Sequence, residues 1–314
     1  MDTSQPLALK FPELVDSTIL AAYDSCPRKA YYQFLLHLSS KRPSVDLHAG
    51  GAFARALEIA RRKYWFAKLP PEEAIYEGLR AFIHFWGEED WDGETKDFVN
   101  VSGAYLDYFR QYPLQADPIR PYIMAGDRPA IEFTFAIPLP IPHPISGQPL
   151  LYGGRMDLVG YYNHFLCIVD EKTTKGIGPK WAEQWGMRGQ FIGYSWACQH
   201  YGIPAKTVLV RGIGILKTEY KHAQAIVQIE DWRIKHWYEN MLRRVKHMIA
   251  DYQLLTQALD DHAFSFSYGD ACQAYGGCMF TDLCKSHDPS IWFDSFGRKE
   301  WNPLAMDPTD PNRS

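Results

Sequence analysis

Two neighbouring stretches decide the fold of this chain: residues 150–161 (LLYGGRMDLVGY) and residues 165–173 (FLCIVDEKT). Both are rich in the branched, aliphatic and aromatic residues that favour β-strands. The pair Asn163-His164 between them is typical of a two-residue turn. The two stretches therefore predict a β-hairpin.

The turn determines which residues of the hairpin lie opposite one another. If it has two residues, Tyr162 faces Phe165, and the same register places Asp157 opposite Asp170. Because side chains alternate along a strand, Lys172 shares the face of Asp170, whereas the residue between them points to the other face. The hairpin thus gathers two carboxylates and one lysine.

This charge pattern indicates metal-dependent phosphodiester chemistry. Two like charges directly opposite one another destabilise a strand pair, and a cation removes that penalty. Mg²⁺ or Mn²⁺ binds through a few carboxylates plus water and substrate phosphate, and suits Asp157 and Asp170. The ion would polarise the scissile phosphate and activate a water molecule, while Lys172 positions that water or stabilises the developing negative charge. The alternative is a solvated hairpin face without function.

A helix after the hairpin offers two further candidates. Gln190 and Tyr194 are four residues apart and would share one helix face turned toward the acidic site. The alternative is ordinary surface polarity combined with core packing.

Four of the six cysteines predict a metal centre that joins the two ends of the chain. One comes early and three follow late at equal spacing: Cys26, Cys272, Cys278 and Cys284. Four thiolates suit either zinc or an iron-sulfur cluster, and the spacing does not choose between them. The alternative is a set of buried free thiols. Disulfides are not expected, since nothing suggests secretion. Cys167 and Cys198, in apolar surroundings, are interpreted as core residues.

Further short motifs accompany these features along the chain. They are Cys26-Pro27-Arg28-Lys29 with Tyr31-Tyr32, Gly50-Gly51-Ala52-Phe53 leading to Leu57-Glu58, Gly154-Arg155-Met156-Asp157-Leu158-Val159, Ile168-Val169-Asp170-Glu171-Lys172-Thr173-Thr174, Gln190 with Tyr194, and Gly277-Cys278 with Cys284. Over about residues 17 to 285 the chain resembles the RecB-like branch of the PD-(D/E)XK nucleases, and within it the iron-sulfur members. Those include AddB-type subunits, cluster-containing CRISPR-associated exonucleases and phage exonucleases.

The resemblance implies a fold, a site and a cofactor. The fold is α/β and restriction-endonuclease-like, with a central mixed β-sheet flanked by helices. Asp157 and Asp170 would bind the metal, and Lys172 would be the catalytic lysine. Gln190 and Tyr194 would match a QxxxY motif that contacts DNA and supports the site. The four cysteines would hold a 4Fe-4S cluster, with zinc as the alternative.

One position departs from the family pattern. Many relatives carry a metal-binding histidine four residues before the position of Glu58, the acid of the first motif, but this chain has Ala54 there. The third ligand would be Glu58, directly or through water, or the two aspartates would hold the metal more loosely. Glu132 is another candidate carboxylate, ranked below Glu58 because it equally fits an exposed strand position.

The formal net charge of −4 is not that of a protein that coats DNA nonspecifically, so contacts to nucleic acid require local basic patches. We expect phosphate contacts from Arg28-Lys29 and from Arg61-Arg62, although each pair also fits a solvated helix face. Trp181 and Trp185 could stack unpaired bases, but core packing is the stronger interpretation.

The pattern of elements predicts one nuclease domain over residues 1–285, with a helical insertion at 67–125, cluster-binding parts at 26 and 272–284, and a loosely packed tail at 286–314. Strands are expected near 130–138, 150–161, 165–173, 207–217 and 224–229, and helices near 181–201 and 231–259. Neither a signal peptide nor a membrane span is expected, which favours a cytoplasmic enzyme in a bacterial or virus-infected cell.

The residues therefore predict a metal-dependent nuclease. By resemblance alone, it is a DNA exonuclease in recombination, repair, replication or phage DNA processing, and single-stranded DNA with free ends is its preferred substrate. The chain has no phosphate-binding GxxxxGK[ST] loop, so an unwinding or recombination partner would be a separate chain. The alternatives are a nucleic-acid-binding subunit that has lost hydrolysis and a zinc-stapled structural protein.

Overall fold

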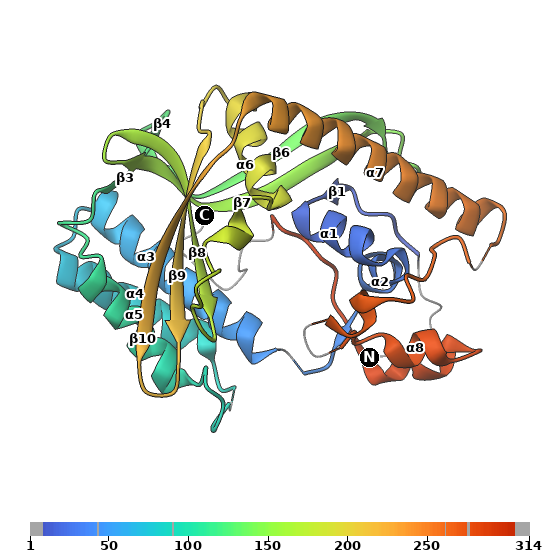
Figure 1. Ribbon diagram of the computed structural model, residues 1–314, viewed down its shortest axis with the longest axis horizontal. Helices are drawn as coiled ribbons and strands as arrows, with labels where there is room; N and C mark the ends of the chain where they lie inside the picture. The colour runs from blue at the N-terminus through green and yellow to red at the C-terminus, as the bar shows by residue number, and fades with distance from the viewer. Residues whose placement is uncertain (1–8, 43, 90, 261, 275–276, 305–314) are drawn as a thin grey trace. The chain divides into compact units, whose positions relative to one another are not determined.

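The computed structural model of the chain describes residues 9–42, 44–89, 91–260, 262–274 and 277–304. They form two compact units, whose elements are labelled in Figure 1. The sheet unit comprises Pro43–Thr134 and Arg155–Ile234, and the cysteine unit comprises Met1–Arg42, Phe135–Gly154 and Lys235–Ser314. Each unit has a hydrophobic cluster of its own.

The sheet unit is built on a mixed β-sheet, as predicted. Its strands are β3 (Ile119–Pro121), β6 (Ile131–Pro142), β7 (Pro149–Tyr162), β8 (Phe165–Thr174), β9 (Thr207–Ile215) and β10 (Tyr220–Gln228). β8 pairs with β9 in parallel and with β7 in antiparallel orientation, and β10 pairs antiparallel with β9. Both β3 and β6 pair with β7. β6 and β7 continue into the cysteine unit.

The hairpin of β7 and β8 has the predicted turn and register. Tyr162 pairs with Phe165. Asn163 and His164 have φ values of 47° and 73°. A two-residue turn with two left-handed residues matches the right-handed twist of the strands, and Asn adopts this conformation readily. The local sequence therefore determines the alignment of the two strands.

Three helices cover one face of the sheet: α3 (Val45–Trp65), α4 (Pro71–Trp86) and α5 (Phe98–Gln111). Their shared core is formed by small and aromatic side chains, including Ala56, Phe53 and Tyr105, and it reaches Ile213 of β9. Because α3 presents alanines, α4 approaches closely: a Cβ added at Gly78 would lie 2.6 Å from the Ala56 carbonyl oxygen. The predicted helical segment 67–125 thus holds α4 and α5, which pack on α3.

The opposite face is covered by the segment that contains Trp181 and by α6 (Gly189–His200). A Cβ added at Gly212 of β9 would meet the Trp181 ring, whereas the adjacent Arg211 bonds Tyr108 of α5. Since neighbouring strand residues face opposite sides, the two coverings lie on opposite faces. Trp181 and Trp185 are buried and pack edge to face at 5.3 Å, so they serve the core and do not offer a stacking surface for bases.

The cysteine unit contains mostly short elements. They are β1 (Leu14–Val15), α1 (Ser17–Ser25), α2 (Pro27–Ala30), the π-helix η1 (Tyr31–Leu35), β2 (Leu38–Ser40), α8 (Thr281–Lys285) and β11 (Phe296–Arg298), with most of the long helix α7 (Asp231–Gln257). Asp16 caps α1 by accepting from the Ile19 N–H, and Pro27 occupies the first turn of α2. Among the helices of the described residues, none is long and apolar enough to cross a membrane.

Part of the tail, up to Leu304, contacts the N-terminal end of the same unit. β11 pairs antiparallel with β2, and the Trp301 indole donates to the buried Asp16 carboxylate at 3.1 Å. Lys10 and Glu300 form an ion pair at 2.9 Å. These contacts hold the described part of the tail in place. The last part of the predicted tail, 305–314, lies outside the described residues.

Candidate active site

The predicted acidic pair lies at the end of the paired part of the hairpin. The pairing between β7 and β8 extends as far as Leu158 and Val169. Asp157 and Asp170 are the next two residues in the same register. Asp170 is only 1% exposed. Burial raises the pKa of Asp157, and the neighbouring Asp170 carboxylate raises it further. The site therefore brings together two carboxylates that burial and mutual repulsion both disfavour as anions.

Lys172 lies on the same side of β8 as Asp170. Its Nζ is 2.7 Å from Asp170 Oδ2. Burial lowers the pKa of Lys172, but the charges of Asp170 and Asp157 outweigh this and raise it above its ordinary value. The lysine is therefore held as a cation beside the two aspartates.

The donor set fits a divalent cation. Among the described residues, Asp170 Oδ2 is a buried oxygen with no partner in hydrogen-bond geometry, although the Lys172 ammonium group is close. Asp157 accepts from the Glu171 N–H at 2.9 Å, which orients its carboxylate. In the part of the chain that the structure describes, no group of three or more His, Cys, Asp or Glu side chains is arranged to hold a metal ion. Water and substrate phosphate would complete the coordination, as is usual for Mg²⁺.

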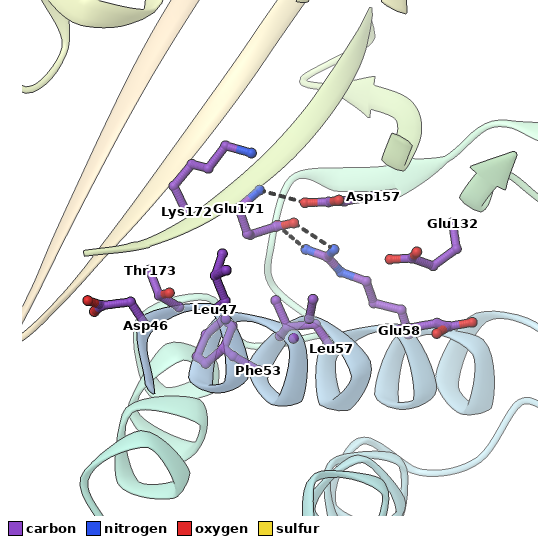
Figure 2. Close-up of a pocket in the computed structure, with 14 residues that line it drawn as sticks. Asp46, Leu47, Phe53, Leu57, Glu58, Glu132, Asp157, Glu171, Lys172 and Thr173 are labelled. Carbon is purple, nitrogen blue, oxygen red and sulfur yellow. Dashed lines mark hydrogen bonds and ion pairs between the residues drawn. The ribbon is translucent and has the colours of Figure 1, made fainter. Parts of the chain in front are cut away.

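A cavity of about 370 Å³ opens beside Asp157 and Lys172 (Figure 2). One wall is helix α3, from Asp46 to Arg61, and the other consists of strand residues that include Glu132, Asp157 and Lys172. Ala54, at the position where many relatives carry a histidine, also lines this cavity. The cavity lies within the sheet unit, so one compact unit supplies all its walls.

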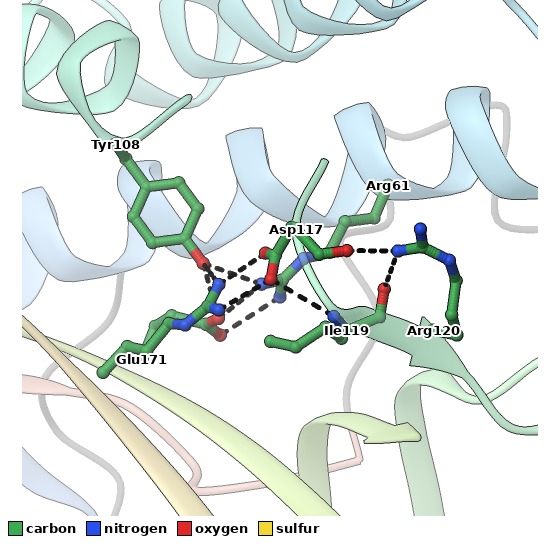
Figure 3. A network of polar contacts seen from close by, with 7 residues as sticks. Arg61, Tyr108, Asp117, Ile119, Arg120 and Glu171 are labelled. Carbon is green, nitrogen blue, oxygen red and sulfur yellow. Dashed lines mark hydrogen bonds and ion pairs between the residues drawn. The ribbon is translucent and has the colours of Figure 1, made fainter. Parts of the chain in front are cut away.

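A buried polar network lies between α3, α5 and β8 (Figure 3), and two of its members, Arg61 and Glu171, also line the cavity. Arg61 pairs with Glu171 through two nitrogens, and the Tyr108 hydroxyl donates to Glu171 Oε1 at 3.0 Å. Arg211 binds Asp117 at 2.6 and 2.8 Å and donates to the Tyr108 hydroxyl. Burial raises the pKa of Glu171, but the guanidinium groups of Arg61 and Arg211 more than offset this and lower it. The network anchors the strand residue between Asp170 and Lys172.

Arg61 is a member of this buried network. Its side chain is only 6% exposed and is paired with Glu171. Arg28 is also buried, with its guanidinium 4.4 Å from the Phe266 ring centre and close to Tyr31. Contact of either residue with a DNA phosphate stays a prediction, and burial disfavours it. Lys29 and Arg62 remain partly exposed.

Glu58 is buried and paired within its own helix. Its carboxylate accepts from Arg55 at 2.7 Å and from Arg62 at 3.0 Å. Arg62 also donates to the Ile131 carbonyl oxygen at 2.9 Å. Glu58 lines the cavity, but its charge is already balanced by two guanidinium groups. Its predicted role as a ligand stays a prediction.

Gln190 and Tyr194 share one face of α6, as predicted. Gln190 Nε2 donates to the Tyr194 hydroxyl at 2.8 Å, and that hydroxyl donates to the Arg155 carbonyl oxygen at 2.7 Å. Tyr194 is 6% exposed. The pair ties α6 to β7 two residues before Asp157. This geometry favours support of the site over direct contact with DNA.

The four predicted ligand cysteines lie near one another in the cysteine unit. Burial raises the pKa of Cys284 to about 11, with further contributions from Cys26, Cys278 and Cys272. All four are free thiols. The Cys278 N–H donates to the Cys272 carbonyl oxygen at 2.9 Å, and Cys278 and Cys284 pack against an apolar cluster around Phe280. Cys167 and Cys198 are buried in the sheet unit, as predicted.

Sequence reasoning missed the partnership of Arg61 with Glu171. Two signals were present: Glu171 must face away from Asp170 and Lys172, and Arg61 follows Glu58 on the same helix. A charged residue on the covered face of a central strand requires a buried counter-charge. The spacing of residues along the sequence does not show which segment supplies this counter-charge.

A buried carboxylate pair with an adjacent lysine on neighbouring strands of a mixed sheet is chemically suited to metal-dependent hydrolysis of phosphodiesters. The model of the PD-(D/E)XK nuclease superfamily matches residues 17–285, and the chain belongs to that superfamily. Members are metal-dependent nucleases that typically use Mg²⁺ or Mn²⁺, and their substrates are nucleic acids.

A comparison with solved structures found similarity to the crystal structure of SSO0001. The two chains are 12% identical, with a TM-score of 0.31, and the match covers 75% of this chain and 78% of the other. The comparison with curated protein sequences gave no significant match.

Proposed function

We propose that this protein is a Mg²⁺- or Mn²⁺-dependent deoxyribonuclease that acts as an exonuclease on single-stranded DNA ends. The observation that carries the nuclease function is the buried group of Asp157, Asp170 and Lys172 beside an open cavity. The action at ends and the choice of single strands rest on the resemblance to cluster-containing exonucleases. Recombination, repair, replication and phage DNA processing all require such an activity.

The chain's own residues hold and orient the reactants. Asp157 and Asp170 would bind the metal ion, which polarises the scissile phosphate and lowers the pKa of a water molecule when bound. The Glu171 N–H fixes the direction of the Asp157 carboxylate. Lys172, kept cationic by Asp170, can stabilise the negative charge that develops on the phosphate oxygens.

Residues around this group support it or contact the substrate. Gln190 and Tyr194 hold α6 against β7, which keeps the Asp157 strand in place. Arg62, whose side chain is 42% exposed, and Lys29 are the predicted residues that could still reach a DNA phosphate. Glu58 is the predicted acid of the helix that lines the cavity.

Linear and circular substrates test this function. Single- and double-stranded DNA, end-labelled or closed into circles, would be incubated with the purified protein and Mg²⁺, Mn²⁺ or a chelator. We expect metal-dependent release of short products from linear single strands and little cutting of circles. Rapid cutting of circular single strands would show an endonuclease. Binding of DNA without any cleavage would favour a non-hydrolytic subunit.

We further propose that Cys26, Cys272, Cys278 and Cys284 hold a 4Fe-4S cluster that stabilises the cysteine unit. The influence of the Cys26, Cys278 and Cys272 thiols on the pKa of Cys284 supports this, as does the chemistry of four thiolates. Protein purified without oxygen should be brown and contain about four iron atoms per chain. A colourless protein that contains one zinc atom per chain would instead show that the four cysteines form a structural zinc site.

A further inference from the structure

Glu132 has a backbone conformation that its position in a strand does not explain. Its φ is +52°, although it is the second residue of β6. A non-glycine residue in the left-handed region costs free energy and persists only where the surroundings enforce it. Those surroundings are present: Arg62 donates to the Ile131 carbonyl oxygen at 2.9 Å, and the Ala130 carbonyl oxygen accepts from the Val159 N–H at 2.8 Å.

This conformation directs the Glu132 side chain toward the acidic pair. The side chain is 10% exposed and lines the same cavity as Asp157 and Lys172. Figure 2 shows its carboxylate pointing toward Asp157. The two are close enough for the Glu132 charge to raise the pKa of Asp157. Glu132 thus adds a third carboxylate beside Asp157 and Asp170, whose negative charges already repel each other.

Arg155 fixes the orientation of the Glu132 carboxylate. Arg155 Nε lies 2.8 Å from Glu132 Oε2. Carboxylates that bind metals are commonly held by such outer hydrogen bonds, which orient them without preventing coordination. Arg155 precedes Asp157 by two residues on β7. The same strand therefore positions Asp157 and also Arg155, the residue that pairs with Glu132.

The alternative third carboxylate, Glu58, is less well placed. Arg55 and Arg62 both bind it, and both belong to the same helix. In Figure 2 its carboxylate extends along α3 and away from Asp157. A divalent cation at Glu58 would lie beside two guanidinium groups, which repel it.

We propose that Glu132 is the third carboxylate of the metal site and completes the protein's share of the ligands with Asp157 and Asp170. Glu132 and Asp157 line one cavity, and Asp170 pairs at 2.7 Å with Lys172, which lines the same cavity. This inference rests on the proposed metal-dependent function. The sequence ranked Glu58 above Glu132 as the third metal ligand, and this proposal reverses that order.

Binding of Mn²⁺ to the full-length protein without DNA tests the proposal by a readout other than activity. Electron paramagnetic resonance of free Mn²⁺ would give the dissociation constant of each variant, and the Tm of the chelator-treated protein would report the fold. Glu132→Gln should weaken Mn²⁺ binding by about tenfold or more. Glu58→Gln should weaken it less. Arg155→Met, which removes the outer hydrogen bond that orients the Glu132 carboxylate, should also weaken it, but less than Glu132→Gln.

A glycine variant separates a ligand from a structural residue. Glu132→Gly removes the carboxylate and also the steric cost of a positive φ. The proposal predicts weaker Mn²⁺ binding together with an equal or higher Tm in the absence of metal. If Glu132 served only to pair with Arg155, the glycine variant would lower the Tm and leave Mn²⁺ binding unchanged, which would overturn the proposal.

Asp157→Asn distinguishes failure of this inference from failure of the nuclease assignment. If Asp157→Asn abolishes Mn²⁺ binding but Glu132→Gln leaves it intact, the metal site stands and Glu132 is not a ligand. If neither variant affects Mn²⁺ binding, the metal site itself is misplaced, and the proposed function fails with it. A larger loss in Glu58→Gln than in Glu132→Gln would return the role to Glu58.

Discussion

Asp157 and Asp170 are subject to two opposing demands. Metal binding requires both to be ionised, whereas burial and mutual repulsion favour protonated carboxyls in the metal-free protein. Lys172 offsets part of this conflict by its charge beside Asp170. The remaining cost is the reason why a divalent cation should bind tightly and stabilise the fold.

The stability of the metal-free protein should depend on this conflict. Burial and Asp170 raise the pKa of Asp157 above its ordinary value of 3.8. A carboxyl whose pKa is higher in the folded state makes stability fall as pH rises from the unfolded pKa through the folded one. Asp157→Asn removes this titration. We expect a Tm a few degrees higher at pH 8 in chelator and a weaker fall between pH 4 and pH 8. A profile identical to that of the wild type would contradict the assigned pKa shift.

Lys172 tests the chemistry separately from metal binding. Lys172→Ala removes the cation that stabilises developing negative charge, so kcat should fall by about 10²–10³-fold. Mn²⁺ affinity should be equal or higher, because a competing positive charge beside Asp170 is gone. Single-turnover cleavage and Mn²⁺ titration would measure both quantities. Undiminished cleavage would remove Lys172 from the mechanism.

At the scale of elements, β8 works through its two faces. One face carries Asp170 and Lys172 to the reaction, and the other carries Glu171 into a buried network with Arg61 and Tyr108. The same Glu171 supplies the N–H that holds Asp157. The covered face of the strand therefore positions the residues of the working face.

A double-mutant cycle measures this coupling. Arg61→Met leaves the Glu171 carboxylate buried without its main counter-charge, which should cost about 3–5 kcal/mol in the free energy of unfolding. The double variant Arg61→Met/Glu171→Met should recover most of that loss, since apolar residues of similar volume often replace a buried ion pair well. Urea unfolding of the metal-free protein would give the values. Additive losses would show that the two residues do not act as a pair.

At the scale of the whole molecule, the cysteine unit joins segments from the two ends of the chain. Cys26 lies directly before α2, and the other three proposed ligand cysteines lie beyond α7. A metal centre that links them closes a loop of almost the entire chain and constrains the unfolded state strongly. Its effect should therefore appear mainly in stability.

Cys284→Ser should lose the metal of this centre and lower the Tm of the protein by several degrees. Cys198→Ala, which changes a buried thiol of the sheet unit, is the matched control and should keep the metal. Iron and zinc analysis together with thermal unfolding would measure the outcome. A Cys284→Ser variant with full metal content would exclude Cys284 as a ligand.

The sequence by itself determined the hairpin, its two-residue turn, its register and the shared face of Asp170 and Lys172. These features could be predicted because strand alternation and turn geometry depend on neighbouring residues alone. The nuclease superfamily followed from the same motifs, and the match over residues 17–285 confirmed it.

Only the tertiary structure decided which distant charges meet. Arg61 and Arg28 were expected on the surface, but Arg61 was required as a counter-charge for Glu171 and Arg28 stacks on Phe266. Glu132 turns toward Asp157 because Arg62 and Val159 constrain the two backbone carbonyl groups that precede it. Burial and charge pairing depend on contacts between segments far apart in the chain, and local spacing carries no information about those contacts.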